Sequence, residues 1–174
     1  MRKSSREVVE SARSISRRGL MLVAIQAAVV GTLVSQIPLS TTPSLTQNLT
    51  SFELPTNSGD RYGTRLSAWL CTTRSGAYTF YIAGDDNAEL YLSTDEHGSN
   101  KRRIAHVPGW TDPRQITKYA EQRSAAIQLE AGKRYFVEAL HKEGAGGDNL
   151  SVGWDLPDGT RELPLPGSRL VPTN

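Results

Sequence analysis

Residues 76–93 read Gly-Ala-Tyr-Thr-Phe-Tyr-Ile-Ala-Gly-Asp-Asp-Asn-Ala-Glu-Leu-Tyr-Leu-Ser, and their pattern is the strongest indication of how the chain folds. In its first half Tyr78, Phe80 and Ile82 occupy every second position, which is the two-residue period of a β-strand with one buried face. The segment Gly84-Asp85-Asp86-Asn87 follows, and Gly, Asp and Asn are common turn residues. A second apolar run comes directly after it, so the stretch predicts two strands joined by a turn.

Further short strand candidates continue on both sides of this stretch. Turn residues separate them at Ser75-Gly76, at Glu130-Ala131-Gly132-Lys133 and at Pro157-Asp158-Gly159. About seven strands at this spacing predict an all-β fold, an antiparallel β-sandwich or barrel. The predicted strands are Arg65–Leu70, Ala77–Ala83, Ala88–Ser93, Arg102–Val107, Ala125–Leu129, Arg134–His141 and Leu150–Leu156.

The first forty residues differ in composition from the rest of the chain. Six of the 20 basic and two of the 18 acidic residues lie in residues 1–18, so this segment carries a net charge of +4 and the remainder −2. The basic run ends in Ser16-Arg17-Arg18 and an apolar run, Leu22–Val30, follows, which is the layout of an export signal of the twin-arginine kind. An uncleaved membrane anchor and an ordinary N-terminus remain alternatives. We therefore divide the chain into an N-terminal segment, residues 1–39, and a β-sandwich domain, residues 40–174.

Composition argues against several functions. A domain with a net charge of −2 offers no basic surface for nucleic acid, so no nucleic-acid partner is expected. The single cysteine, Cys71, excludes an internal disulfide, and the three histidines lack the spacing of zinc ligands. No Ser/His/Asp order and no spaced carboxylate pair stands out as a catalytic set. We therefore expect a protein that binds a partner rather than an enzyme.

Two loops carry residues that could bind a cation. Asp85 and Asp86 are adjacent, and the repulsion between their carboxylates costs free energy unless a cation or a hydrogen-bond donor compensates. Calcium takes about six to eight oxygen ligands, so two carboxylates and nearby carbonyls are a suitable start, whereas a plain hairpin turn is the alternative. The second loop, His141–Asn149, is rich in glycine and offers Asp148 and Asn149 as further oxygen ligands.

Tryptophan side chains could stack on sugar rings. Trp110 lies in the turn-rich segment Pro108–Pro113 and is the expected surface aromatic. Trp154 lies inside a strand pattern and is expected in the core.

Two separated motifs resemble the PA14 (protective-antigen-type) domain family in its bacterial form. The first is the stretch 76–93, and the second is the run Ala131–Gly144. Asp148-Asn149-Leu150-Ser151-Val152-Gly153-Trp154 and the closing Pro164–Leu170 continue the match, which extends from about Ser51 to Pro172. Two motifs in the right order make the resemblance specific.

The resemblance implies a jelly-roll type of antiparallel β-sandwich, found in adhesins, lectins and toxins. In the lectin members a pair of aspartates, joined by a cis peptide bond, chelates Ca2+, which in turn coordinates sugar hydroxyls. Here that role would fall to Asp85 and Asp86, with Asn149 as the further ligand and Asp148 as its alternative. The implied function is a calcium-dependent carbohydrate-binding or adhesion module, exported to the periplasm, the cell surface or the medium, whose ligand is a glycan or a cell-surface molecule, with Trp110 contacting sugar. The alternative is a structural or protein-interaction domain in which calcium only stabilises a loop, and contact with a membrane is expected only through an uncleaved N-terminal segment.

Overall fold

The computed structural model describes residues 20–22, 29, 31 and 33–173. In these residues short and medium strands are joined by loops and by single turns of 3-10 helix. The strands are β1 (Leu20–Leu22), β2 (Gln47–Leu49), β3 (Gly63–Cys71), β4 (Gly76–Asp85), β5 (Asn87–Leu92), β6 (Arg102–Val107), β7 (Ile127–Leu129), β8 (Arg134–Lys142), β9 (Asn149–Asp155), β10 (Arg161–Glu162) and β11 (Leu170–Pro172). The 3-10 turns are η1 (Val34–Gln36), η2 (Gly98–Asn100), η3 (Ala120–Gln122) and η4 (Gly167–Arg169).

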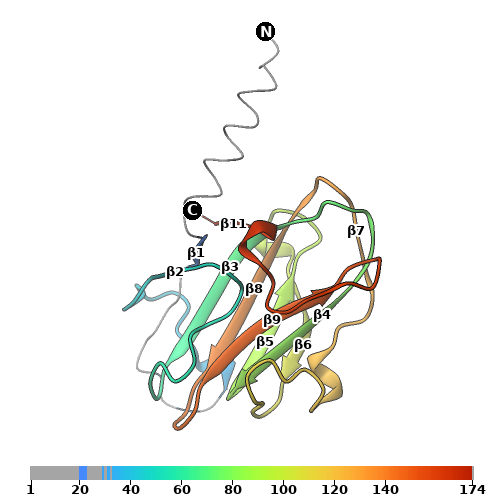
Figure 1. Ribbon diagram of the computed structural model, residues 1–174. Coiled ribbons are helices and arrows are strands. Elements are labelled where there is room, and N and C mark those ends of the chain that lie inside the picture. Colours follow the sequence, from blue (N-terminus) through green and yellow to red (C-terminus); the bar gives the residue numbers. More distant parts are fainter. Residues whose placement is uncertain (1–19, 23–28, 30, 32, 174) are drawn as a thin grey trace.

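Two antiparallel sheets pack face to face (Figure 1). One has five strands in the order β11-β3-β8-β5-β6, and the other has four in the order β10-β9-β4-β7, while β1 and β2 form a separate two-stranded ribbon. The seven strands predicted from the sequence correspond to β3 through β9, and β6 has the predicted bounds. The predicted all-β antiparallel sandwich is therefore confirmed.

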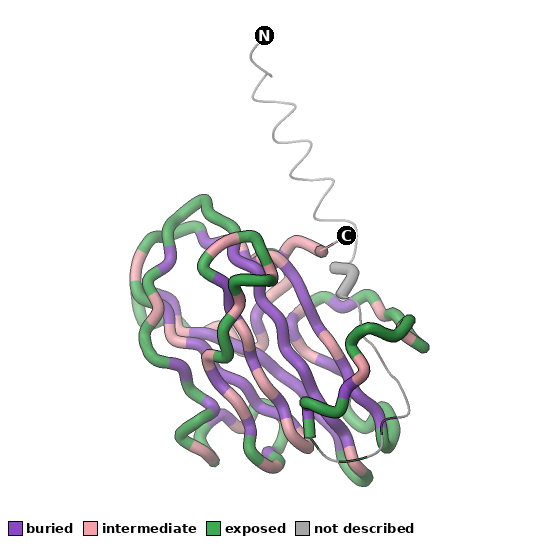
Figure 2. The backbone as a smooth tube through the Cα atoms, turned by 180° about the vertical axis from the view of Figure 1, so that it is seen from behind, coloured by how far each residue is buried: buried purple, intermediate pink, exposed green. Residues whose placement is uncertain are grey.

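The core lies between the two sheets and follows the period-two pattern of the sequence. Tyr78, Phe80 and Ile82 of β4 are buried. Trp154 of β9 is buried beside them, with its ring centroid 4.7 Å from that of Tyr78 and 5.7 Å from that of Phe80. Figure 2 shows buried residues running along the strands and exposed residues gathering in the loops. Burial of each large apolar side chain contributes roughly 1.5–3 kcal/mol to folding, so most of the stability comes from the core between the sheets. The loops contribute less, and they are where binding residues are usually found.

The segment before β3 also contributes to the core. Phe52 is fully buried, and residues 51 and 53 form isolated bridges to Pro166 and Ser151, so this segment is extended along the domain. Val34 and Ile37 form a small second cluster with Leu140 of β8. Most of the predicted export signal, residues 1–19, 23–28, 30 and 32, lies outside the described residues. Within the described residues, no helix is long and apolar enough to cross a lipid bilayer.

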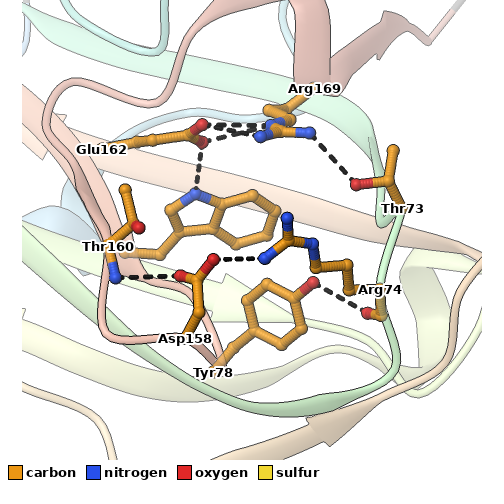
Figure 3. Close-up of polar contacts among 8 residues, drawn as sticks. Thr73, Arg74, Tyr78, Asp158, Thr160, Glu162 and Arg169 are labelled. Carbon is orange, nitrogen blue, oxygen red and sulfur yellow. Dashed lines mark hydrogen bonds and ion pairs between the residues drawn. The ribbon is translucent and has the colours of Figure 1, made fainter.

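A cluster of polar contacts closes one end of the four-stranded sheet (Figure 3). The indole N–H of Trp154 donates to Glu162 Oε2 at 2.7 Å, and Arg169 Nη2 donates to Glu162 Oε1 at 2.7 Å. Arg74 forms an ion pair with Asp158 and accepts a hydrogen bond from the Tyr78 hydroxyl at its backbone carbonyl. Because these polar groups form hydrogen bonds and ion pairs with one another, we assign this end of the sandwich a structural role.

Candidate metal centre

The paired aspartates lie where β4 ends and β5 begins, at the lower end of the sandwich in Figure 1. Asp85 is the last residue of β4 and stands opposite Asn149, the first residue of β9. Asp86 connects β4 to β5, and a cis peptide bond joins the two aspartates, as the resemblance implied. Both side chains are half-buried, so their carboxylates are partly removed from water.

A third carboxylate, Glu143, converges on the pair. Asp85, Asp86 and Glu143 each present an oxygen such that the three oxygens lie within 4.8 Å of one another. Glu143 is fully buried, and neither of its carboxylate oxygens has a hydrogen-bond partner. Burying an ionised carboxylate without a partner costs several kcal/mol of folding free energy. A bound cation would compensate for this cost.

Glu143 was not predicted as a site residue, and strand register explains its position. Asn87 at the start of β5 pairs with Lys142 at the end of β8. The residue before Asn87 is Asp86 and the residue after Lys142 is Glu143, so the antiparallel register brings these two together at the end of the sheet. Glu143 could have been predicted as a site residue only if the pairing of β5 with β8 had been known.

Burial and neighbouring negative charges raise the pKa values of Asp85 and Glu143. Burial raises the pKa of Asp85 to about 6, and the charges of Asp86 and Asp148 act in the same direction. Burial likewise raises the pKa of Glu143 to about 7, with the charges of Asp86, Asp85 and Asp148 adding to it. The buried Lys142 donates to the carbonyl of Glu143, and burial lowers its pKa. The site therefore gathers more negative than positive charge.

The two predicted residues of the second loop lie beside this cluster in different roles. Asn149 is buried, and its Nδ2 donates to the carbonyl of Thr111 at 2.8 Å while its Oδ1 has no partner. Asp148 is also buried, its Oδ2 accepts from the backbone N–H of Gly59 at 3.0 Å, and its Oδ1 has no partner. Asn149 is thus positioned next to Asp85 with a free oxygen, whereas Asp148 also anchors a neighbouring loop.

The glycines of the second loop allow close contact with the aspartates. The backbone N–H of Gly144 donates to Asp86 Oδ2 at 2.8 Å, and a Cβ atom at Gly144 would lie only 2.8 Å from that oxygen. The neighbouring loop before β3 joins in, since Arg61 N–H donates to the carbonyl of Gly144 at 2.8 Å and Gly146 N–H donates to Asp60 Oδ1 at 3.1 Å. This loop was not predicted to belong to the site, because no local sequence pattern marks it.

Trp110 lies in a loop that is tied to the metal-binding candidates through Thr111. The hydroxyl of Thr111 accepts from Gly84 N–H at 2.9 Å, and Thr111 N–H donates to the carbonyl of Gly84 at 2.8 Å. The carbonyl of Thr111 also accepts a hydrogen bond from Asn149, so Thr111 connects the Trp110 loop to both β4 and β9. Trp110 is 50% exposed, as the sequence predicted for a surface aromatic, and Lys118 Nζ lies 3.0 Å from its ring centroid.

The donor set suits a hard divalent cation. It consists of carboxylate and amide oxygens from the end of β4, the β4–β5 connection and the segment between β8 and the start of β9, with unpartnered oxygens on Glu143, Asn149 and Asp148. Calcium prefers such oxygen ligands. His141 takes a different part, since its Nε2 contacts the carbonyl of Asp85 and its ring packs edge-on against Tyr62.

Comparisons with known proteins agree with this architecture. Residues 42–168 match the model of the PA14 domain. The mouse protein N-acetyl-beta-glucosaminyl-glycoprotein 4-beta-N-acetylgalactosaminyltransferase 1 is 38% identical over 98 residues, which cover 53% of this chain and 10% of the mouse protein. The chain therefore spans about a tenth of the length of that curated relative.

Solved structures show the same fold. An anti-sigma factor domain-containing protein from Clostridium clariflavum superposes with a TM-score of 0.63 at 19% identity, covering 90% of this chain and 49% of that protein. A PA14 sugar-binding domain from an RTX adhesin superposes with a TM-score of 0.62 at 15% identity, covering 84% of this chain and 94% of that domain.

Proposed function

The chain belongs to the PA14 domain family, and from this premise we propose that it is a calcium-dependent carbohydrate-binding or adhesion module, lectin-like and without catalytic activity of its own. The observation that carries the proposal is the convergence of oxygens from Asp85, Asp86 and Glu143 within 4.8 Å at a loop-lined end of the sandwich.

In this proposal Asp85, Asp86 and Glu143 hold the cation, with Asn149 Oδ1 as a further ligand and Asp148 as its alternative. Calcium, when bound, supplies positive charge and coordination positions that vicinal sugar hydroxyls can take from water. The chain's own residues orient the site: Thr111 fixes Asn149 at 2.8 Å, and Gly144 N–H holds one oxygen of Asp86. The exposed ring of Trp110 offers an apolar surface to a sugar ring beside it.

The absence of catalysis is part of the proposal. The three converging carboxylates are close together and share one local environment, whereas hydrolysis of a glycosidic bond uses two carboxyl groups on either side of that bond, roughly 5–10 Å apart. The match to the mouse glycosyltransferase covers 10% of that protein, so it supports a shared module and not a shared reaction.

A structural or protein-interaction domain is the second candidate. Asp86 already binds Gly144 and Asp148 already binds Gly59, so a bound calcium could serve only to stabilise these loops. The resemblance to an anti-sigma factor domain-containing protein is compatible with a domain of this kind.

The proposal includes export, with the chain acting outside the cell or in the periplasm. The basic segment with Arg17 and Arg18 before an apolar run supports it, as does the named adhesin among the structural neighbours. The assignment to the bacterial form of the family rests on the run Ala131–Gly144 and belongs to the same proposal. Any membrane contact would then involve only the N-terminal segment.

Thermal melts of the full chain in calcium and in chelator test the metal site. Calcium at 100 times its dissociation constant should stabilise the wild type by about 2.7 kcal/mol. The double variant Asp85→Asn/Asp86→Asn should not respond, whereas the control Glu96→Gln/Glu130→Gln, which removes two charges from exposed residues, should respond like the wild type. A wild type that is indifferent to calcium would refute the metal site.

A glycan array with and without chelator separates the two candidates. Binding that needs calcium and disappears in Asp85→Asn/Asp86→Asn supports the carbohydrate-binding module. Calcium-dependent stability without binding to any glycan supports the structural or protein-interaction domain.

A further inference from the structure

Beside the carboxylate cluster lies a cationic platform formed by Trp110 and Lys118. Lys118 is exposed, and its Nζ lies 3.0 Å from the Trp110 ring centroid while donating to the Trp110 carbonyl at 2.9 Å. A lysine ammonium has three donors, so two remain after this hydrogen bond. In the described residues, Lys118 forms no ion pair with a carboxylate. The charge is therefore presented to solvent on the face of an aromatic ring.

The platform is held in a fixed position. Gln122, which is fully buried, accepts hydrogen bonds from the backbone N–H groups of Lys118 and Tyr119, each at 2.9 Å. On the other side of the loop, Arg114 forms two hydrogen bonds with Glu53, at 2.8 and 2.7 Å. The backbone of Lys118 is therefore ordered before a ligand binds, which lowers the entropic cost of binding.

The loop that carries the platform is hydrogen-bonded to the strands that carry Asp85 and Asn149. Thr111, the residue next to Trp110, contacts both Gly84 and Asn149. One ligand could therefore contact the Trp110–Lys118 platform and the metal centre at once.

We propose that the Trp110–Lys118 platform makes this site selective for glycans that carry an anionic group, a carboxylate or a sulfate, over the matching neutral glycans. The inference rests on the proposed carbohydrate-binding function. The Lys118 ammonium pairs with the anionic group, and the indole supports the adjoining sugar ring. Without calcium the acidic cluster repels such a ligand, so the selectivity depends on a loaded metal site.

The test uses the full chain with calcium on an array of neutral oligosaccharides and the same oligosaccharides carrying a sulfate, a uronic acid or a sialic acid. We expect at least one acidic probe to bind roughly fivefold more tightly than its neutral parent, as a partly exposed ion pair can provide. The preference should weaken at high ionic strength because salt screens exposed charges. The anionic group of the preferred probe identifies whether carboxylate or sulfate is recognised.

Variants of Lys118 isolate the cause. In Lys118→Met the ratio of acidic to neutral affinity should fall to about one, and in Lys118→Arg it should be retained, because arginine keeps the charge and the contact with the ring. Lys133→Met, which removes an exposed lysine in the turn before β8, should leave the ratio unchanged. Calcium titration of each variant verifies that the metal centre is still loaded.

Each outcome has a distinct meaning. A ratio that is the same in Lys118→Met as in the wild type, or a preference for neutral probes, would overturn this inference while leaving carbohydrate binding intact. Binding to no probe at all, with calcium bound, would overturn the proposed carbohydrate function and the inference with it.

Discussion

The side-chain Nδ2 of Asn149 donates to the backbone carbonyl of Thr111 at 2.8 Å, and Oδ1 of the same side chain is buried without a partner. The first contact fixes the orientation of the amide. The second atom is then the one left for a ligand, directly opposite Asp85 in the strand register. A single asparagine thus joins the Trp110 loop to the carboxylate cluster, and its Oδ1 is the atom that we propose as a calcium ligand.

Asn149→Ala should weaken calcium binding by roughly tenfold or more, because it removes a candidate ligand and releases the Thr111 loop. It should also lower the free energy of unfolding of the metal-free protein by about 1–3 kcal/mol, since the Thr111 carbonyl loses its donor. Isothermal calorimetry and denaturant melts measure the two effects. Asn100→Ala, an exposed asparagine that contacts Asp95, is the control, and calcium affinity equal to wild type in Asn149→Ala would exclude Asn149 as a ligand.

Local patterns in the sequence were enough to predict the seven strands β3 to β9, but not the short strands β1, β2, β10 and β11. Period-two burial in β4 and the turn residues around it reflect only neighbouring positions, and the same holds for the core position of Trp154 and the exposure of Trp110. Asp85 and Asp86 were predictable as a candidate site because two adjacent carboxylates in a turn are conspicuous without any tertiary information.

Glu143 and Gln122 were not predictable in the same way. Glu143 reaches the cluster through the pairing of β5 with β8, and Gln122 reaches β4 across 40 residues of sequence. The predicted domain boundary at residue 40 also leaves residues 33–37 outside the β-sandwich domain, yet Val34 and Ile37 pack on Leu140. Such contacts depend on register and on tertiary packing, which no local period encodes.

Gln122 is predicted to be essential for the loop that carries Trp110 and Lys118. Its Nε2 donates to the carbonyls of Ile82 and Gln115 at 2.8 and 2.6 Å, and its Oε1 accepts from two backbone N–H groups. Gln122→Leu would remove the side-chain partner of four buried or partly buried backbone groups, so we expect a loss of about 2–4 kcal/mol in unfolding free energy. Urea melts measure it. Gln128→Leu, on the exposed face of β7, should change stability by less than about 0.5 kcal/mol, and equal effects of the two substitutions would contradict the assigned role.

Glu143→Gln should have opposite effects with and without calcium. The substitution removes a negative charge that repels Asp85 and Asp86, so the metal-free protein should melt at a higher temperature at neutral pH and above. It also removes a charged group that we propose as a calcium ligand, so calcium affinity should fall by roughly tenfold or more. Differential scanning calorimetry measures the expected rise in melting temperature, and calcium titration measures the expected loss of affinity.

Glu138→Gln is the matched control for this sign change. Glu138 is also fully buried, but it pairs with Arg65 and Lys101. Its substitution should lower the unfolding free energy by about 1.5–3 kcal/mol both with and without calcium, because a hydrogen-bonded charge is lost. If Glu143→Gln behaved like Glu138→Gln, Glu143 would be a structural residue rather than a ligand.

The pH dependence of the metal-free protein should expose the same repulsion. The pKa of Glu143 rises from 4.5 to about 7 and that of Asp85 from 3.8 to about 6 on folding. A raised pKa means that the folded state holds the proton more tightly, so stability from this source is fully present below about pH 4 and is lost as pH rises through 6–7. The melting-temperature advantage of Glu143→Gln over the wild type should therefore be small at pH 5 and grow by pH 8.

Comparison with the variant cancels the opposite contribution of His141, whose pKa burial lowers and which both proteins share. Calcium should reverse the trend, because the cation binds deprotonated carboxylates, so the calcium-induced rise in the wild-type melting temperature should increase between pH 5 and pH 8. Calorimetry of metal-free and calcium-loaded protein across this range measures both trends. An advantage of Glu143→Gln that stayed constant with pH would show that folding does not raise the pKa of Glu143, and it would refute the repulsion assigned to the carboxylate cluster.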